Sequence, residues 1–171
     1  MMKVAKLLPL TLIATILIVA CGTEEDEEVE SAELPAEMPD DFNFSLTYGY
    51  AGANGIDTYE GTVTKDLIPN GDVTIDLSLT ESEMEEIYDQ MVEVNLLETA
   101  EYVSDVQCVD PHGQNYIEMT INGERVEREW ISAQCDGNDE QLSEWLSFIH
   151  FELIEPKEEY QALPDPEGGY D

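Results

Sequence analysis

The hydrophobic residues of the chain follow two periods, one typical of strands and one typical of helices. Between Phe42 and Tyr50 every second residue is apolar or aromatic, and this period of two predicts a strand with one buried face. After a glycine-rich turn we expect a second strand near 56–64. A third alternating run near 73–79 follows the turn at Pro69-Asn70-Gly71.

Two segments carry apolar residues at the helical spacing. Thr80 and Glu83 have the spacing of a capping box, which predicts the start of a helix. A second helix is expected to start near 138 or 139 and to end near Pro156. The apolar stripes of these helices are Met84, Ile87, Tyr88, Met91 and Val92 in the first, and Leu142, Trp145, Leu146, Ile149 and Leu153 in the second.

A β-hairpin is predicted around Asn122-Gly123, because this dipeptide suits a tight type I′ turn. Pairing Ile121 with Glu124 in the turn supports this register, because five hydrophobic residues then share one face: Ile117, Met119, Ile121, Val126 and Trp130. On the other face Glu118 lies opposite Glu127, an unfavourable pair that Arg125 or a bound cation could relieve.

The order of these elements is β-β-β-α-β-β-α. It predicts an α+β domain over 42–171, with a mainly antiparallel sheet of about five strands and two amphipathic helices. Residues 157–171 contain Pro164, Pro166 and Gly168-Gly169, so we expect them to run over the surface as a tail.

The N-terminus has the features of an export signal. Lys3 and Lys6 precede an uncharged run of 14 residues, 7–20, which is shorter than the ~20 apolar residues that span a bilayer. The sequence Ile18-Val19-Ala20-Cys21 follows, and it resembles the lipobox of bacterial lipoproteins. That resemblance implies a signal peptide at 1–20, cleavage before Cys21 and membrane attachment through palmitate-type acyl chains on the Cys21 sulfur; the alternative is an uncleaved anchor.

The segment after Cys21 is expected to be a flexible tether that extends to residue 41. Between 22 and 41 the chain has ten acidic residues, Pro35 and Pro39, and no basic residue. Such a composition buries too little apolar surface to offset the entropy of ordering.

The charge of the chain is extreme: 40 Asp and Glu stand against 6 Lys and Arg, a formal net charge of −34. Removal of Lys3 and Lys6 with the signal peptide leaves four basic residues against 40 acids, a net charge of −36. This charge repels phosphate backbones, so we expect no nucleic-acid partner. Two interpretations stay open: an adaptation to the environment, or a surface that binds cations.

Cys108 and Cys135 flank the predicted hairpin, and an exported protein meets an oxidising environment, so we expect a disulfide between them. The alternative is a metal site that includes His112. The run 136–140 begins like a calcium loop, but Gln141 takes the place of the required glycine. We therefore predict no EF-hand, no metal ligands and no cofactor, although a looser carboxylate site stays open.

Catalysis has little support in the sequence. The chain has only two histidines, and His150 lies beside the apolar stripe of the second helix, where a structural role is expected. Sequence motifs of common hydrolases, such as Gly-x-Ser-x-Gly and His-Glu-x-x-His, are absent. The sequence favours a protein that is not an enzyme.

Three stretches, at 52–66, 79–91 and 157–170, resemble uncharacterised lipoproteins of Bacillus-like bacteria. The resemblance implies a Gram-positive cell surface and carries no activity. The leading hypothesis is a lipid-anchored, non-catalytic binding or interaction module on the extracytoplasmic face of the membrane. The alternative is a divalent-cation-binding surface protein. Possible partners are cations or a cell-envelope component, and the sequence specifies no protein partner.

Overall fold

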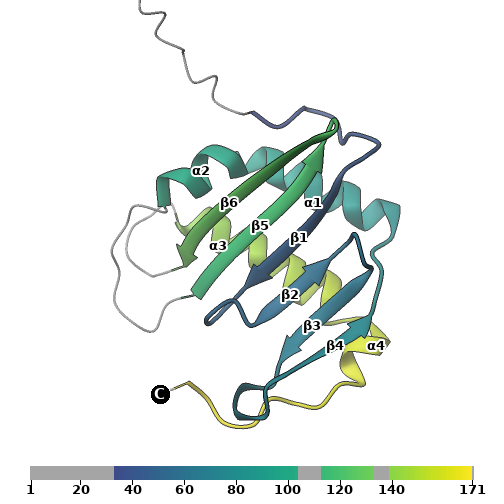
Figure 1. Ribbon diagram of the computed structural model, residues 1–171, viewed down its shortest axis with the longest axis vertical. Helices are drawn as coiled ribbons and strands as arrows, with labels where there is room; N and C mark the ends of the chain where they lie inside the picture. Colours follow the sequence, from purple (N-terminus) through teal and green to yellow (C-terminus); the bar gives the residue numbers. More distant parts are fainter. Residues whose placement is uncertain (1–32, 104–112, 133–138, 171) are drawn as a thin grey trace, which may run out of the picture. The chain divides into compact units, whose positions relative to one another are not determined.

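The strands form one antiparallel sheet of six strands in a computed structural model that describes residues 33–103, 113–132 and 139–170. The order across the sheet is β4-β3-β2-β1-β5-β6 (Figure 1). The predicted α+β class is confirmed, with six strands in place of about five. The strands are β1 (Asn43–Tyr48), β2 (Asn54–Asp57), β3 (Thr62–Asp66), β4 (Asp72–Asp76), β5 (Gly113–Ile121) and β6 (Glu124–Ser132).

The additional strand arises because the single strand expected near 56–64 is in fact a hairpin of β2 and β3. The Asp57 carboxylate accepts hydrogen bonds from the backbone N–H groups of Tyr59 (2.9 Å) and Glu60 (3.0 Å), which turns the chain. Gly61 then adopts a φ of 66°, a conformation that glycine tolerates without steric cost.

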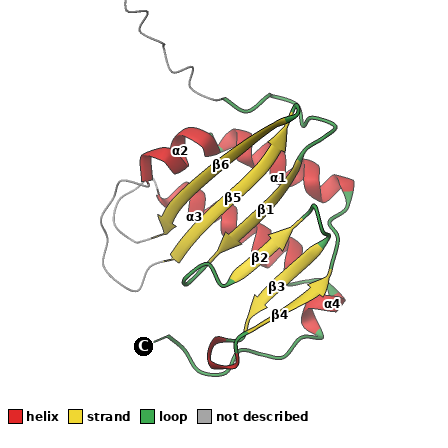
Figure 2. Ribbon diagram, in the orientation of Figure 1, coloured by secondary structure: helices red, strands yellow, loops and turns green. Residues whose placement is uncertain are grey.

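The helices lie on one face of the sheet, so the domain has two layers (Figure 2). Strands β1 to β4 follow one another as a meander to one edge of the sheet, and the chain then crosses behind it to place β5 beside β1. The helical elements are α1 (Glu81–Glu93), α2 (Leu96–Val103), α3 (Asp139–Ser147), a π-helical stretch (Phe148–Ile154) and α4 (Glu158–Gln161).

Local sequence signals account for helix α1 and for the β5–β6 hairpin. The capping box is present at α1, where the Thr80 hydroxyl accepts from the Glu83 N–H and the Glu83 carboxylate accepts from the Thr80 N–H. The β5–β6 hairpin has the predicted register, with Ile121 paired to Glu124 and Glu118 opposite Glu127. Arg125 relieves that like-charge pair, since its guanidinium lies 2.9 Å from the Glu118 carboxylate.

The core lies between the sheet and the helices. Alternate residues of β1 and β5 point into it, as the period of two requires, and the apolar stripes of α1 and α3 face them. Full burial of a large apolar side chain stabilises a fold by roughly 1.5–3 kcal/mol. The largest fully buried side chains are Phe44, Leu46, Ile87, Tyr88, Met91, Leu96, Ile117, Met119, Trp130, Leu142, Trp145 and Ile149.

The second predicted helix changes its geometry midway. It runs as an α-helix through Ser147 and continues as a π-helix to Ile154, next to the expected end at Pro156. The expected tail also differs, because it begins with the short helix α4, whose Tyr160 is buried. Lys157 holds this segment to the start of α1 through an ion pair of 2.6 Å with Glu83.

Residues 33–41, which we assigned to the tether, contact the domain. Leu34 and Met38 pack against the core, and the Pro35 carbonyl accepts a hydrogen bond from the Tyr88 hydroxyl (2.9 Å). The Asp41 carboxylate accepts from the backbone N–H groups of the hairpin turn, at 2.9 Å from Asn122 and 2.6 Å from Gly123. These residues therefore form one wall of the packed domain.

Candidate functional site

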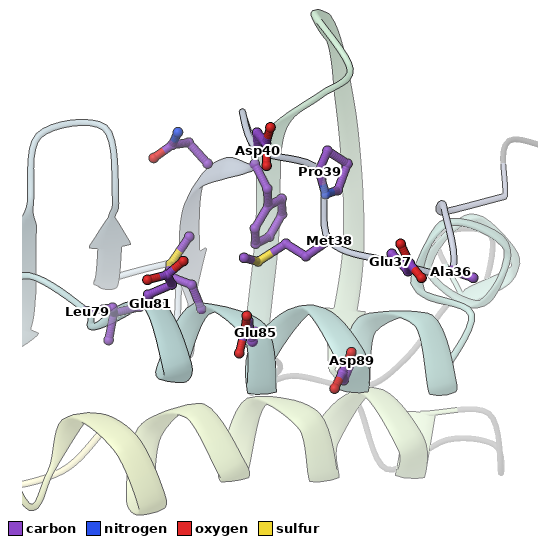
Figure 3. A pocket seen from close by; sticks show the side chains of 12 residues that line it. Ala36, Glu37, Met38, Pro39, Asp40, Leu79, Glu81, Glu85 and Asp89 are labelled. Carbon is purple, nitrogen blue, oxygen red and sulfur yellow. The ribbon is translucent and has the colours of Figure 1, made fainter.

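A groove of about 600 Å³ lies between the segment 36–43 and helix α1. Figure 3 shows the segment running along the helix, with Met38 between them. Two contacts hold this segment beside α1. The Tyr88 hydroxyl bonds to Pro35, and the Phe42 ring meets the Tyr88 ring edge-on at a centroid distance of 4.8 Å.

The rim of this groove is acidic. Glu81, Glu85 and Asp89 follow one another at intervals of four residues, so they lie on one side of α1 about 6 Å apart along its axis. Glu37 and Asp40 line the groove from the segment 36–43. Among the described residues that line the groove, none is basic.

Apolar side chains form the floor of the groove. Phe42 is buried, while Met38, Leu79 and Met84 are half-buried and pack against the core. Thioether side chains adapt to ligands of different shape. We call this region, with its five carboxylates and its apolar floor, the acidic groove.

A second, smaller cavity of about 270 Å³ lies where the π-helical stretch meets the sheet. None of its nine described lining residues carries a carboxylate. We call it the neutral pocket; its lining residues are Tyr48, Gly49, Asn115, Ser132, Ser143, Leu146, Ser147, His150 and Phe151.

Asn115 organises the neutral pocket. It is the buried polar residue of β5, 1% exposed, and its side chain has three partners. Its carbonyl oxygen accepts from the Gly49 N–H (3.3 Å), and its amide donates to the Trp130 carbonyl (3.4 Å) and to the Ser132 hydroxyl (2.6 Å). These bonds tie the end of β1 to β6 and keep the pocket wall in place.

His150 forms another part of the wall. Its Nδ1 lies 2.8 Å from the Tyr48 hydroxyl, and its ring meets the Tyr48 ring edge-on at 5.7 Å. Burial lowers the pKa of His150 by more than the nearby Glu155 carboxylate raises it, and the Lys65 charge lowers it a little further, so the imidazole is neutral at pH 7. Burial raises the pKa of Tyr48, so its hydroxyl stays protonated.

Phe151 lines both the neutral pocket and another cavity, of about 380 Å³. The Phe151 ring is 58% exposed, although large apolar side chains are normally buried. The cavity of about 380 Å³ is lined by basic Lys65 and by acidic Glu155 and Asp165. The Lys65 ammonium lies over the Tyr160 ring, 4.9 Å from its centroid. The π-helical geometry brings His150 and Phe151 to the wall of the neutral pocket, and π-helical turns are frequent at functional sites.

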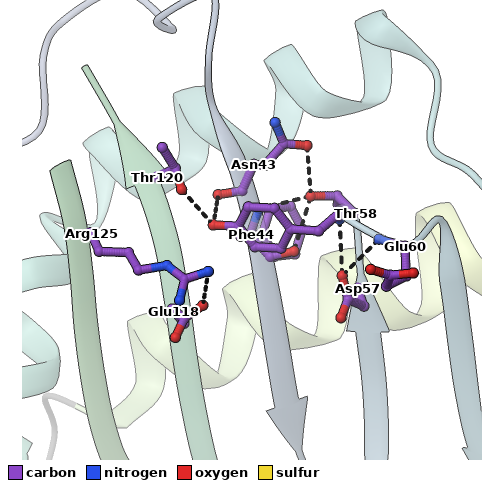
Figure 4. A network of polar contacts seen from close by, with 9 residues as sticks. Asn43, Phe44, Asp57, Thr58, Glu60, Glu118, Thr120 and Arg125 are labelled. Carbon is purple, nitrogen blue, oxygen red and sulfur yellow. Dashed lines mark hydrogen bonds and ion pairs between the residues drawn. The ribbon is translucent and has the colours of Figure 1, made fainter. Parts of the chain in front are cut away.

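The open face of the sheet carries a network of polar side chains. Its side chains bond to one another, as Figure 4 shows. The Tyr59 hydroxyl contacts the Asn43 carbonyl (3.1 Å) and the Thr120 hydroxyl (2.8 Å), and Thr58 bonds to Asn43 and Phe44. We interpret this network as structural, because its polar groups are already partnered.

The predicted modification and disulfide sites, Cys21, Cys108 and Cys135, lie outside the described residues, as does His112. The disulfide and the lipid on Cys21 therefore stay predictions. Within the described ranges, no group of three or more His, Cys, Asp and Glu side chains is placed to hold a metal ion. His150 is half-buried, and its ring lies edge-on to those of Tyr48 and Tyr160, but its position in the pocket wall was not evident from the sequence.

Comparison with known proteins identified no relative: no protein-family model, curated protein or solved structure matches the chain. Among the described helices, none is long and apolar enough to cross a membrane.

Proposed function

We propose that this protein is a lipid-anchored, non-catalytic binding module of the cell surface, and that its acidic groove binds a positively charged, partly apolar segment of a partner protein. The observation that carries this proposal is the pairing of five carboxylates with an apolar floor in one groove of about 600 Å³. A basic amphipathic segment would place its apolar side chains on Met38 and Met84 and its charges on the rim.

The spacing of the rim suits a helical ligand. Glu81, Glu85 and Asp89 repeat every four residues, so lysines at the same interval on a bound helix can each meet one carboxylate. Each such contact near a protein surface contributes on the order of 1 kcal/mol and weakens with salt. The net charge of −34 also accelerates the approach of a cationic partner over a longer range.

A binding experiment with charge-reversal variants separates the groove from the general charge. The probe is a synthetic amphipathic peptide with leucines on one face and lysines on the other, measured by calorimetry. Glu85→Lys should weaken binding about tenfold, which corresponds to 1.4 kcal/mol. Glu86→Lys is the matched control: Glu86 is adjacent, also exposed and on the same helix, but it is not among the residues that line the groove. Equal effects of both variants would mean that only net charge attracts the peptide.

The anchor has its own test. Replacing Cys21 with Ser should block lipidation, so the protein should leave the membrane fraction or accumulate unprocessed. Intact mass measurement of the wild type should show the added acyl chains. If the Cys21→Ser protein stays with the membrane at the wild-type mass, the lipid anchor is wrong, whatever the groove binds.

A further inference from the structure

The neutral pocket departs from the rest of the chain in its composition. The chain has 40 acidic residues, yet none of the nine described residues that line this pocket is acidic. A positively charged ligand would find no counter-charge in its walls. An anionic ligand would be repelled by the net charge of −34. The composition therefore favours a neutral ligand.

The walls offer hydrogen-bonding groups that point to a hydroxyl-rich ligand. The Ser147 hydroxyl is exposed, and the Ser132 hydroxyl, which accepts from Asn115, can still donate its own hydrogen. Nδ1 of His150 is occupied by Tyr48, so Nε2 is the ring position that can bond to a ligand. Hydroxyl groups can donate and accept, and thus suit every one of these partners.

Phe151 adds an apolar surface at the border of the pocket. Its 58% exposure leaves much of the ring open to a ligand. The carbon-bound hydrogens on one face of a sugar ring pack against such a ring, while the hydroxyls at its rim reach polar groups. Specific pockets combine apolar walls with a few fixed polar groups in this way.

We propose that the neutral pocket binds one ring of an uncharged sugar, with Phe151 against the ring and Ser132, Ser147 and His150 bonded to its hydroxyls. Its volume of about 270 Å³ is just below the ~300 Å³ at which pockets for larger ligands begin, so it suits a single ring. Because Phe151 also borders the cavity of about 380 Å³, a longer saccharide can continue past it. This site is separate from the acidic groove and does not depend on the peptide ligand proposed there.

The test uses saturation-transfer NMR on the full chain with methyl β-D-glucoside, in about 0.3 M salt to screen long-range charge. Glucosamine and glucuronate serve as cationic and anionic probes of the same ring. The glucoside should bind with a dissociation constant on the order of 1–10 mM, as a small ligand with few contacts does. Tighter binding of either charged sugar would overturn the assignment of a neutral ligand. If benzyl alcohol binds and the glucoside does not, the assignment of a sugar as the ligand is wrong.

Variants locate the site. Phe151→Ala should weaken glucoside binding at least about tenfold, and Ser147→Leu, which fills the pocket from its exposed side, should abolish it. Tyr170→Ala is the matched control, because Tyr170 is also an exposed aromatic residue but does not line the pocket. Melting curves establish that each variant folds, and peptide binding to the acidic groove should not change. Undiminished glucoside binding in both folded pocket variants would overturn the proposal.

Discussion

The acidic groove and the neutral pocket belong to one domain, yet they have opposite compositions. Five of the twelve described residues that line the groove are acidic, whereas none of the nine described pocket residues is. The groove carboxylates stand on the exposed side of α1 and on the segment beside it. The pocket is built from strand ends and the π-helical stretch, around the buried amide of Asn115.

The cost of burying a charge explains why the two sites differ in composition. An exposed carboxylate on α1 stays hydrated, so it has little effect on folding. A carboxylate in place of Asn115 would have to lose its hydration in the interior, at a cost of several kcal/mol unless it were paired. Neutral hydrogen-bonding groups can be buried when they are partnered, and Asn115 has three partners.

The largest expected effect concerns the predicted disulfide. Ser132 lines the pocket, and the chain on either side of the hairpin carries Cys108 and Cys135. Replacing both cysteines by Ser should lower the free energy of unfolding by roughly 3–4 kcal/mol, because the disulfide would restrict the unfolded chain. Urea unfolding measures this change, and glucoside binding should suffer while peptide binding in the groove does not. Two freely alkylatable thiols in the unreduced exported protein would contradict the disulfide and revive the metal site.

Asn115 and Asn43 provide the next contrast, since one organises the pocket and the other lines the groove. Asn115→Ala leaves buried partners unsatisfied and should cost about 2–3 kcal/mol of stability. Asn43→Ala, at a half-buried position, should cost about 1 kcal/mol or less. Urea unfolding of both variants tests the comparison. Equal losses would mean that burial of the amide and its partners does not decide the cost.

Salt should stabilise the protein by about 1 kcal/mol, mainly through screening of regions such as the acidic groove. Sodium chloride and potassium chloride should act alike and without saturation, as judged by melting curves. Calcium at constant ionic strength should add no saturable increment. A specific site would instead add about 2.7 kcal/mol at a hundred times its dissociation constant. That result would favour the divalent-cation-binding alternative.

The smallest effect is the pH dependence that His150 contributes. Burial holds its pKa below that of the unfolded chain, so the unfolded state binds the proton more readily. The contribution is complete above about pH 6.5 and is lost as the pH falls. The loss should be below about 1 kcal/mol because His150 is partly exposed. Between pH 7 and about pH 5 the wild type should therefore lose more stability than His150→Gln; equal losses would contradict the role of burial.

Signals within a few residues predicted several elements correctly. The Thr80–Glu83 box began α1, and Asn122-Gly123 produced the turn and register of the β5–β6 hairpin. The split of 56–64 into β2 and β3 also has a local cause, the turn from Asp57 to Gly61. A single strand over 56–64 would place Ile56 and Val63 on opposite faces, whereas the turn pairs them and buries both.

The polarity pattern, the class of fold, the charge and the N-terminal signal from which we predict an anchor can all be read from the sequence, because each depends on composition or on neighbouring residues. The positions of the two candidate sites depend on the tertiary structure. The acidic groove joins residues 36–43 to 79–89, and the neutral pocket joins Tyr48, Asn115, Ser132 and His150 from separate segments. The π-helical turn that brings Phe151 to the surface is another such result, since Ile149, Leu153 and Ile154 are buried against the core beside it. These arrangements depend on how the sheet and helices pack, and packing joins residues that have no relation along the chain.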